Sequence, residues 1–256
     1  MRHAIITAGT KGLGRKVTEE MLEAGYSVTV TYRQDQQKAE EIFQQLPSYS
    51  DRIQCVQADV TLVDDLPNIV NKAMERFGRI DVLINNAGPY IFERKKLMDY
   101  TTEEWNRMIN GNLDAVFHLL KLVVPIMRAQ KFGRIINYGF QGANGAPGWM
   151  YRSAFAAAKT GLVSLTKTIA YEEAEYGITS NMICPGKIVG DMKEADIADS
   201  RPHKDEQTPI GRSGTGGDIA RSILFLCGDD ADMVTGTVME VTGGMDVIHK
   251  YCYKTP

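Results

Sequence analysis

Cysteine is scarce in this sequence, and neither sign of charge dominates it. The 256 residues include four cysteines, Cys55, Cys184, Cys227 and Cys252, with no C-x-x-C pair. This scatter favours reduced thiols in a cytoplasmic protein over a disulfide framework or a metal site, so we expect no bound metal. The net charge of −3 and the pI near 5.9 give no basic footprint, which argues against a nucleic-acid partner.

Long hydrophobic runs are missing as well. The longest apolar stretch, residues 116–127, contains His118 and Lys121, and it is shorter than the roughly 20 apolar residues that cross a bilayer. The amino terminus enters an apolar segment at once, without the charged region and apolar core of a signal peptide. We therefore expect neither a membrane span nor a secretory leader.

Strand and helix patterns alternate along the chain. Apolar or β-branched runs predict strands at residues 4–6, 27–32, 53–58, 80–84, 134–137, 178–183 and 238–241. Helical patterns lie at residues 13–24, 34–46, 66–77, 102–130, 151–176 and 218–227. We expect Thr102 and Ser153 to cap the two long helices. Strands separated by helices imply βαβ units and a parallel sheet.

One segment lacks either pattern. Residues 187–207 are charged and contain Pro202, and we interpret them as a mobile substrate lid, with a plain surface excursion as the alternative. No repeat, linker or low-complexity segment divides the sequence. We therefore expect a single domain over residues 1–256.

The stretch from His3 to Gly14 combines three features of a nucleotide site. An apolar run is followed by a turn with Gly9, Gly12 and Gly14, and a helix then begins at Leu13. Glycines let a ligand approach the backbone closely, and the amino end of a helix attracts a pyrophosphate. Because the spacing is not G-x-G-x-x-G, an ordinary glycine-rich loop is the alternative.

Further motifs follow in order along the whole chain. They are TAGTKGLG at 7–14, Asp59-Val60 after the third strand, NNAG at 85–88, Asn112, Lys159 within AFAAAKTGL, Pro185-Gly186, and TG…VTGG between 235 and 244. Together they resemble the motifs of the short-chain dehydrogenase/reductase (SDR) family. Within that family, the sequence is most similar in general character to the 3-oxoacyl-carrier-protein reductases. The resemblance implies an α/β fold with a doubly wound parallel sheet (a Rossmann fold) and helices on both faces. It also implies a nicotinamide dinucleotide at the carboxyl ends of the strands.

The resemblance assigns cofactor contacts by position. The pyrophosphate would be held by Gly9, Thr10, Lys11, Gly12, Leu13 and Gly14, the adenine edge by Asp59 and Val60, the adenosine ribose by Asn86, Ala87 and Gly88, the nicotinamide ribose by Lys159, and the nicotinamide by Pro185, Gly186 and Ile188. For NNAG, a simple junction between strand and loop is the alternative reading.

Charge at the end of the second strand bears on the choice of cofactor. A cofactor without a 2′-phosphate is usually held there by an acid, and this sequence has Thr31, with Arg33 nearby and Lys11 in the glycine turn. Two cations suit a phosphomonoester, so NADP(H) is preferred and NAD(H) is the alternative. Asp35 is the residue that opposes this preference.

Two departures concern cofactor binding. Ala8 replaces the first family glycine, and its methyl group is tolerated if the backbone there has a negative φ. Gly190 stands where the family usually has a threonine beside the nicotinamide, which removes one orienting hydrogen bond.

The catalytic positions depart most from the family. The tyrosine that acts as acid and base, four residues before Lys159, is Phe155, and Phe140 lies at or beside the serine position. No serine or threonine occurs between Tyr138 and Tyr151. Loss of an acid/base group costs about 10²–10⁴-fold in rate, and loss of an oxyanion donor costs about 10²–10³-fold. Of the two family roles of Lys159, only its grip on the ribose survives.

A tyrosine elsewhere could replace the lost acid. Tyr151 lies eight residues before Lys159 and would have to precede the helix and fold back; the seven-residue spacing of some enoyl reductases falls on Arg152. Tyr90 and Tyr138 are the other candidates, and aromatic packing is the alternative role for each of the three.

Two functions stay open at this point. The first is an NADP(H)-dependent oxidoreductase that acts on a small or acyl carbonyl or enone, with a substituted proton source such as Tyr151 or a water on Lys159. The second is a catalytically inactive pseudoenzyme that serves as a cofactor sensor or structural subunit. In both cases the resemblance implies a homo-oligomer, a dimer or tetramer, assembled through helices 102–130 and 151–176.

Overall fold

The computed structural model describes residues 1–246 and residue 248. Its seven strands are all parallel and follow the order β3-β2-β1-β4-β5-β6-β7. The strands are β1 (His3–Ile6), β2 (Ser27–Tyr32), β3 (Ile53–Gln57), β4 (Val82–Asn85), β5 (Gly133–Tyr138), β6 (Ile178–Pro185) and β7 (Val238–Val241). The order reverses between β1 and β4, so the sheet is doubly wound, as the sequence predicts.

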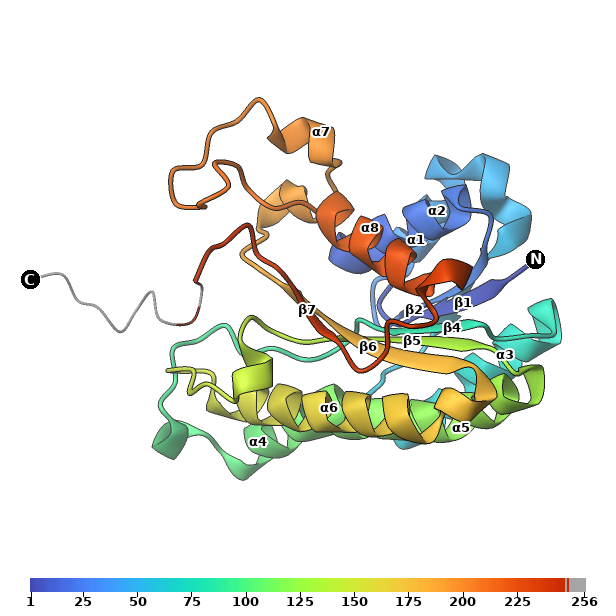
Figure 1. Ribbon diagram of the computed structural model, residues 1–256, viewed down its shortest axis with the longest axis horizontal. Coiled ribbons are helices and arrows are strands. Elements are labelled where there is room, and N and C mark those ends of the chain that lie inside the picture. Colours follow the sequence, from blue (N-terminus) through green and yellow to red (C-terminus); the bar gives the residue numbers. More distant parts are fainter. Residues whose placement is uncertain (247, 249–256) are drawn as a thin grey trace, which may run out of the picture.

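Helices cover both faces of the sheet (Figure 1). One face carries α1 (Gly12–Glu23), α2 (Gln36–Gln45) and α8 (Gly216–Cys227). The other carries α3 (Leu66–Phe77), α4 (Thr102–Ile109), α5 (Ala115–Gln130) and α6 (Ser153–Glu172). Both faces of a parallel sheet are buried, which explains the near-continuous apolar strands.

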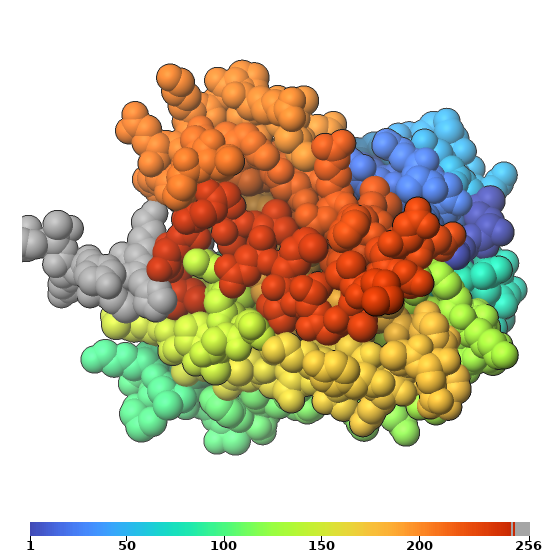
Figure 2. Space-filling model, viewed as in Figure 1, coloured from blue at the N-terminus to red at the C-terminus, as the bar shows by residue number. Residues whose placement is uncertain are grey.

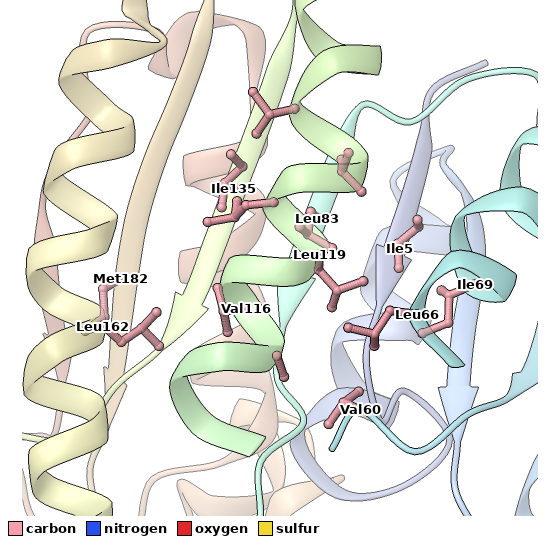
Figure 3. Packing of buried hydrophobic residues seen from close by; sticks show 14 of the residues in the cluster. Ile5, Val60, Leu66, Ile69, Leu83, Val116, Leu119, Ile135, Leu162 and Met182 are labelled. Atoms are coloured by element: carbon pink, nitrogen blue, oxygen red, sulfur yellow. The ribbon is translucent and has the colours of Figure 1, made fainter. Parts of the chain in front are cut away.

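Alternate side chains of each strand feed two separate cores. Ile5 and Leu83 point toward Leu66 of α3 and Leu119 of α5 (Figure 3), whereas Ile6 belongs to the core beneath α1 and α8. This division follows from the two-residue period of a strand. It also determines, for each residue at a strand end, on which side of the sheet its side chain lies.

The predicted helix over residues 102–130 is divided. A π-helical turn, Asn110–Asp114, separates α4 from α5, and the N-cap is Thr101, which accepts a hydrogen bond from Glu104 N at 3.2 Å. The expectation of Thr102 is therefore wrong by one residue, because Thr102 already has helical geometry. By length and composition alone this helical run could cross a membrane, but Leu119 and its neighbours pack against the sheet.

The second expected cap is also wrong. Ser153 is the first residue of α6, and the N-cap is Arg152, which makes no side-chain capping bond.

The segment 187–207 contains two short helices, the 3-10 turn η7 (Gly190–Lys193) and α7 (Ile197–Ser200). Figure 2 shows this segment as a projecting lobe above the last strand. Whether it moves stays a prediction. Within the described residues, Cys55, Cys184 and Cys227 are free thiols. Cys252 lies outside the described residues.

Candidate functional site

The turn between β1 and α1 requires its glycines for close packing. A Cβ at Gly14 would lie 2.3 Å from the carbonyl oxygen of Ala8, and one at Gly9 would lie 2.7 Å from Val30 Cγ1. Gly12 has a φ of +60°, which favours glycine. The start of α1 is thereby brought against the end of β1 and the loop after β4.

Ala8 has a φ of +53°, so the condition under which its methyl group would be tolerated without strain is not met. A left-handed conformation costs a non-glycine residue about 1–2 kcal/mol. Hydrogen bonds hold it in place: Ala8 N donates to Thr31 Oγ1 at 2.9 Å, and Asn86 Nδ2 donates to the Ala8 carbonyl at 3.2 Å. The strain at Ala8 is therefore offset by the end of β2 and the loop after β4.

A groove of about 560 Å³ crosses the carboxyl ends of β1 to β4. It brings together seven of the residues assigned to the cofactor, namely Thr10, Lys11, Arg33, Asp59, Val60, Ala87 and Gly88. Its lining also includes Arg107 of α4, which no sequence signal pointed to. The groove lies beside the reversal of strand order, where doubly wound proteins bind nucleotides.

The charged residues at the end of β2 form ion pairs. Lys11 Nζ lies 3.3 Å from Asp35 Oδ2, and Arg33 lies 3.8 Å from Asp59 Oδ2. Asp35 also caps α2, and the hydrogen bond from Lys38 N, with the nearby Lys11, lowers the pKa of Asp35. Asp35, the acid whose charge opposes a 2′-phosphate, is thus paired with Lys11 and hydrogen-bonded to the first turn of its own helix.

The glycine turn already holds an anion. Gly12 N donates a hydrogen bond of 2.6 Å to the carboxylate of Glu194, which comes from the segment 187–207. An ion pair between Lys16 and Asp196 ties the same segment to α1. The carboxylate of Glu194 stands in for a phosphate oxygen, so this amide fits the group that a dinucleotide would place there.

Two of the assigned polar residues have structural partners. Asn86 Nδ2 donates to the carbonyls of Thr7 and Ala8, at 2.9 and 3.2 Å, so its side chain ties two loops together. Asn112 lies buried in the π-helical turn and donates to the carbonyls of Pro89 and Met108. Both residues therefore position the loop after β4.

Phenyl and indole rings fill the catalytic positions. Phe140 stacks on Trp149 with ring centroids 5.1 Å apart, and Phe155 meets Tyr90 edge to face at 5.0 Å. Lys159 Nζ lies 5.8 Å from the centroid of Phe155. Burial lowers the pKa of Lys159 to about 8. Phenylalanine offers no hydroxyl group at either catalytic position, and Lys159 is buried beside these rings.

A second cavity, of about 310 Å³, lies beside these rings. Pro185 and Gly186 form part of its lining, as does Tyr151, which precedes α6 with a φ of +65°. Tyr90 lines both cavities, and its hydroxyl oxygen accepts a hydrogen bond of 2.5 Å from Arg152 Nε. Tyr151 and Tyr90 therefore both have access to a substrate.

The position of Tyr138 favours aromatic packing, its alternative role, over proton donation. It is buried in the core beneath α1 and α8, and its hydroxyl has no hydrogen-bond partner within the described part of the chain. Burial raises its pKa. Ile136 and Tyr138 are two residues apart on β5 and share this face of the sheet, whereas Phe140 follows the end of β5 and packs in the other core.

The fold and the two adjoining cavities define a doubly wound α/β protein of the nucleotide-binding type. More specifically, the chain belongs to the short-chain dehydrogenase/reductase family of oxidoreductases. A family model described as enoyl-(acyl carrier protein) reductase matches residues 7–246. This confirms the resemblance on which the residue assignments depend.

Individual relatives support the family and the similarity to 3-oxoacyl reductases. The chain is 66% identical to "Putative oxidoreductase YtkK" of Bacillus subtilis (strain 168), over 98% of both chains. It is 37% identical to the 3-oxoacyl-[acyl-carrier-protein] reductase FabG of Staphylococcus epidermidis, over 95% of this chain and 98% of FabG. A solved structure of a "putative 3-oxoacyl-reductase" from Bacillus thuringiensis is 67% identical, with a TM-score of 0.93, over 97% of this chain and all of that one. The chain thus resembles 3-oxoacyl reductases along nearly its whole length.

Proposed function

We propose that the protein binds NADP(H) and reduces the carbonyl group or activated double bond of a small or acyl substrate. The observation that carries the proposal is the position of the two cavities: the groove at β1 to β4 and the second cavity share Tyr90 in their linings. The names of its relatives, a 3-oxoacyl-[acyl-carrier-protein] reductase among them, agree with this reaction class.

The preference for NADP(H) over NAD(H) rests on the end of β2. Thr31, at the position of the usual acid, is buried, and its hydroxyl accepts from Ala8 N. Lys11 and Arg33 line the groove together with Asp35. A 2′-phosphate would meet two cations there, Lys11 and Arg33, and each of the two nearby acids, Asp35 and Asp59, already lies close to one of them.

The bound cofactor supplies the hydride, and the chain has to supply a proton to the substrate oxygen. Phe155 and Phe140 carry no exchangeable proton, so the phenols of Tyr151 and Tyr90 are the candidates in the cavity wall. Lys159, whose ammonium is buried, holds a ribose hydroxyl. We assign the proton to Tyr151, and we expect slow turnover because Tyr151 lies outside the helical register of the family tyrosine.

The test is NADPH oxidation with a panel of ketones and enones, followed by single substitutions. Tyr151→Phe should lower kcat by about 10²-fold or more, in the range of a lost general acid. Tyr90→Phe is the matched control and should leave a measurable rate. A larger loss in Tyr90→Phe than in Tyr151→Phe would reassign the donor, and unchanged rates in both would exclude either phenol.

The aromatic side chains at and beside the catalytic positions favour a second function. Because Phe140, Trp149 and Phe155 contact one another, the protein could bind the cofactor without turning it over, as a sensor or subunit. Tight NADPH binding with no oxidation across the panel would establish this function. The double change Phe155→Tyr with Phe140→Ser should then create reductase activity if the cavity admits a substrate.

Assembly and location complete the proposal. We propose a cytoplasmic homo-oligomer that forms through α5 and α6, because Phe117 on α5 is 46% exposed and a hollow of about 310 Å³ lies between the two helices. The free thiols of Cys55, Cys184 and Cys227 suit a reducing compartment. Light scattering should report a dimer or tetramer, and Phe117→Asp should shift it toward the monomer.

A further inference from the structure

We infer that the cavity beside Phe140 selects carbonyl or enone substrates that carry an anionic group, a carboxylate or a phosphate, on a flat apolar body. The inference rests on the proposed function and adds the substrate class. It is carried by the side chains that line the cavity, which combine aromatic walls with positive charge.

Three cations reach this cavity from three different parts of the fold. Arg94 comes from the loop after β4, Arg152 from the start of α6, and Lys187 from the loop after β6. Among the described residues that line the cavity, none is an aspartate or glutamate. Charges from separate segments that converge on one hollow create a local positive potential, although the whole chain has a net charge of −3.

Arg152 is held firmly and retains its charge. Its guanidinium donates to Tyr90 Oη at 2.5 Å, and to the carbonyls of Phe92, Glu93 and Tyr151 at 3.0, 2.7 and 2.7 Å. All four acceptors are uncharged, so these bonds orient Arg152 without neutralising it. A ligand carboxylate or phosphate gains from such a preorganised cation, because the protein has already paid the ordering cost.

The two other cations lie in more exposed positions. The guanidinium of Arg94 lies 5.8 Å from the centroid of the Tyr151 ring, at the wall of the cavity. Hydrogen bonds from Thr208 Oγ1 at 2.9 Å and Ser213 Oγ at 3.1 Å lower the pKa of the Asp205 carboxyl, and the positive charge of Lys187 lowers it further, so Asp205 partly balances Lys187. Arg94 and Lys187 therefore provide charge at the rim, where it steers an anion and adds modestly to affinity.

The apolar body is inferred from the aromatic and apolar residues of the same lining. Phe140 and Trp149 stack with an interplanar angle of 29°, and Met150 lies beside them in the lining. An engineered apolar cavity of about 150 Å³ accommodates benzene, so about 310 Å³ is sufficient for a substituted ring. A planar keto acid would meet both the aromatic side chains and the positive charge of this lining, whereas a small neutral ketone would gain nothing from that charge.

Trp149 offers a readout that is independent of turnover. The sequence has two tryptophans, so a Trp105→Phe background leaves Trp149 as the single indole emitter. The probes are 4-acetylbenzoate, 4-acetylphenyl phosphate and the neutral isostere 4-acetylbenzamide, titrated into the protein without NADPH. We expect at least one anionic probe to bind at least about tenfold more tightly than the amide, with an affinity that falls as salt is added.

Substitutions locate the effect. Lys187→Gln and Arg94→Gln should each weaken anion binding about three- to tenfold and leave amide binding unchanged. Lys121→Gln, which removes an exposed cation of α5 outside the cavity, is the matched control and should change neither. The carboxylate and phosphate arms show which anion the cavity prefers.

The inference is overturned if the amide binds as tightly as both anions, if none of the probes quenches Trp149 at millimolar concentration, or if Lys121→Gln matches the two cavity variants. Failure of the proposed function gives a different result. In that case the apoprotein still discriminates the anionic probes, but NADPH is not oxidised in the presence of any of them.

Discussion

The contact between Glu194 and the glycine turn predicts that removal of one carboxylate strengthens cofactor binding. Gly12 N lies at the amino end of α1, where it has no acceptor within the helix, and it donates a hydrogen bond of 2.6 Å to Glu194 Oε1. A pyrophosphate that binds to this turn has to displace Glu194 and would be repelled by it if it stayed close. Glu194→Gln should therefore lower the dissociation constant of NADPH.

The size of the effect follows from the lost charge. A hydrogen bond to a charged group contributes about 1.5–3 kcal/mol, and a neutral one about 0.5–1.5 kcal/mol. Glu194 is exposed to solvent, so we take the low end of the difference, about 1 kcal/mol. Since about 1.4 kcal/mol corresponds to a tenfold change in affinity, the dissociation constant should fall roughly three- to tenfold.

Calorimetric titration of NADPH into the two proteins measures this change directly. The matched control is Asp191→Asn, because Asp191 lies in η7, the short helix whose C-cap is Glu194, and within the described part of the chain its side chain makes no hydrogen bond to the turn. An unchanged dissociation constant in Glu194→Gln would show that Glu194 does not compete with the cofactor. Weaker binding would show that the carboxylate supports the bound state, and it would refute the reasoning.

Two further predictions concern stability and pH. Burial holds the pKa of Lys159 at about 8, below its usual 10.5, so the unfolded chain binds more protons above pH 8 and the free energy of unfolding should rise by about 3 kcal/mol between pH 8 and 10.5. Urea unfolding of Lys159→Met should lack this rise, and an equal rise in both proteins would contradict the assignment. His3 is buried with a pKa lowered to about 4, so about 3 kcal/mol of stability should be lost as the pH falls from 6.5 to 4. His3→Gln should show a correspondingly smaller loss over that range, and a parallel decline would count against His3 as its source.

The sequence predicts most strand and helix positions because local periodicity determines them. β2 (Ser27–Tyr32), α3 (Leu66–Phe77) and β7 (Val238–Val241) begin and end where their patterns predict. Each is bounded by turn residues and presents one consistent period of apolar side chains. The parallel order of the sheet follows from the helices between the strands.

Contacts between distant segments were not predictable in this way. Glu194 and Gly12 are 182 residues apart, and Arg152 and Tyr90 are 62 apart. No periodic pattern connects such pairs, and each depends on how a loop crosses the carboxyl edge of the sheet. The positive φ of Ala8 has the same origin, because the bonds that hold it come from Thr31 and Asn86.

The structure separates cofactor binding from proton delivery in space. The groove at β1 to β4 uses strand ends, backbone amides and the ion pairs of Lys11 and Arg33, and neither Phe140 nor Phe155 contributes to its lining. Phe140 and Phe155 offer no hydrogen bond to the ammonium of Lys159, and burial lowers its pKa to about 8. At neutral pH most of this ammonium is still charged, as the proposed hold on a ribose hydroxyl requires. We therefore expect substitution at the catalytic positions to leave cofactor binding intact, whereas the chemistry depends on which phenol of the second cavity reaches the substrate.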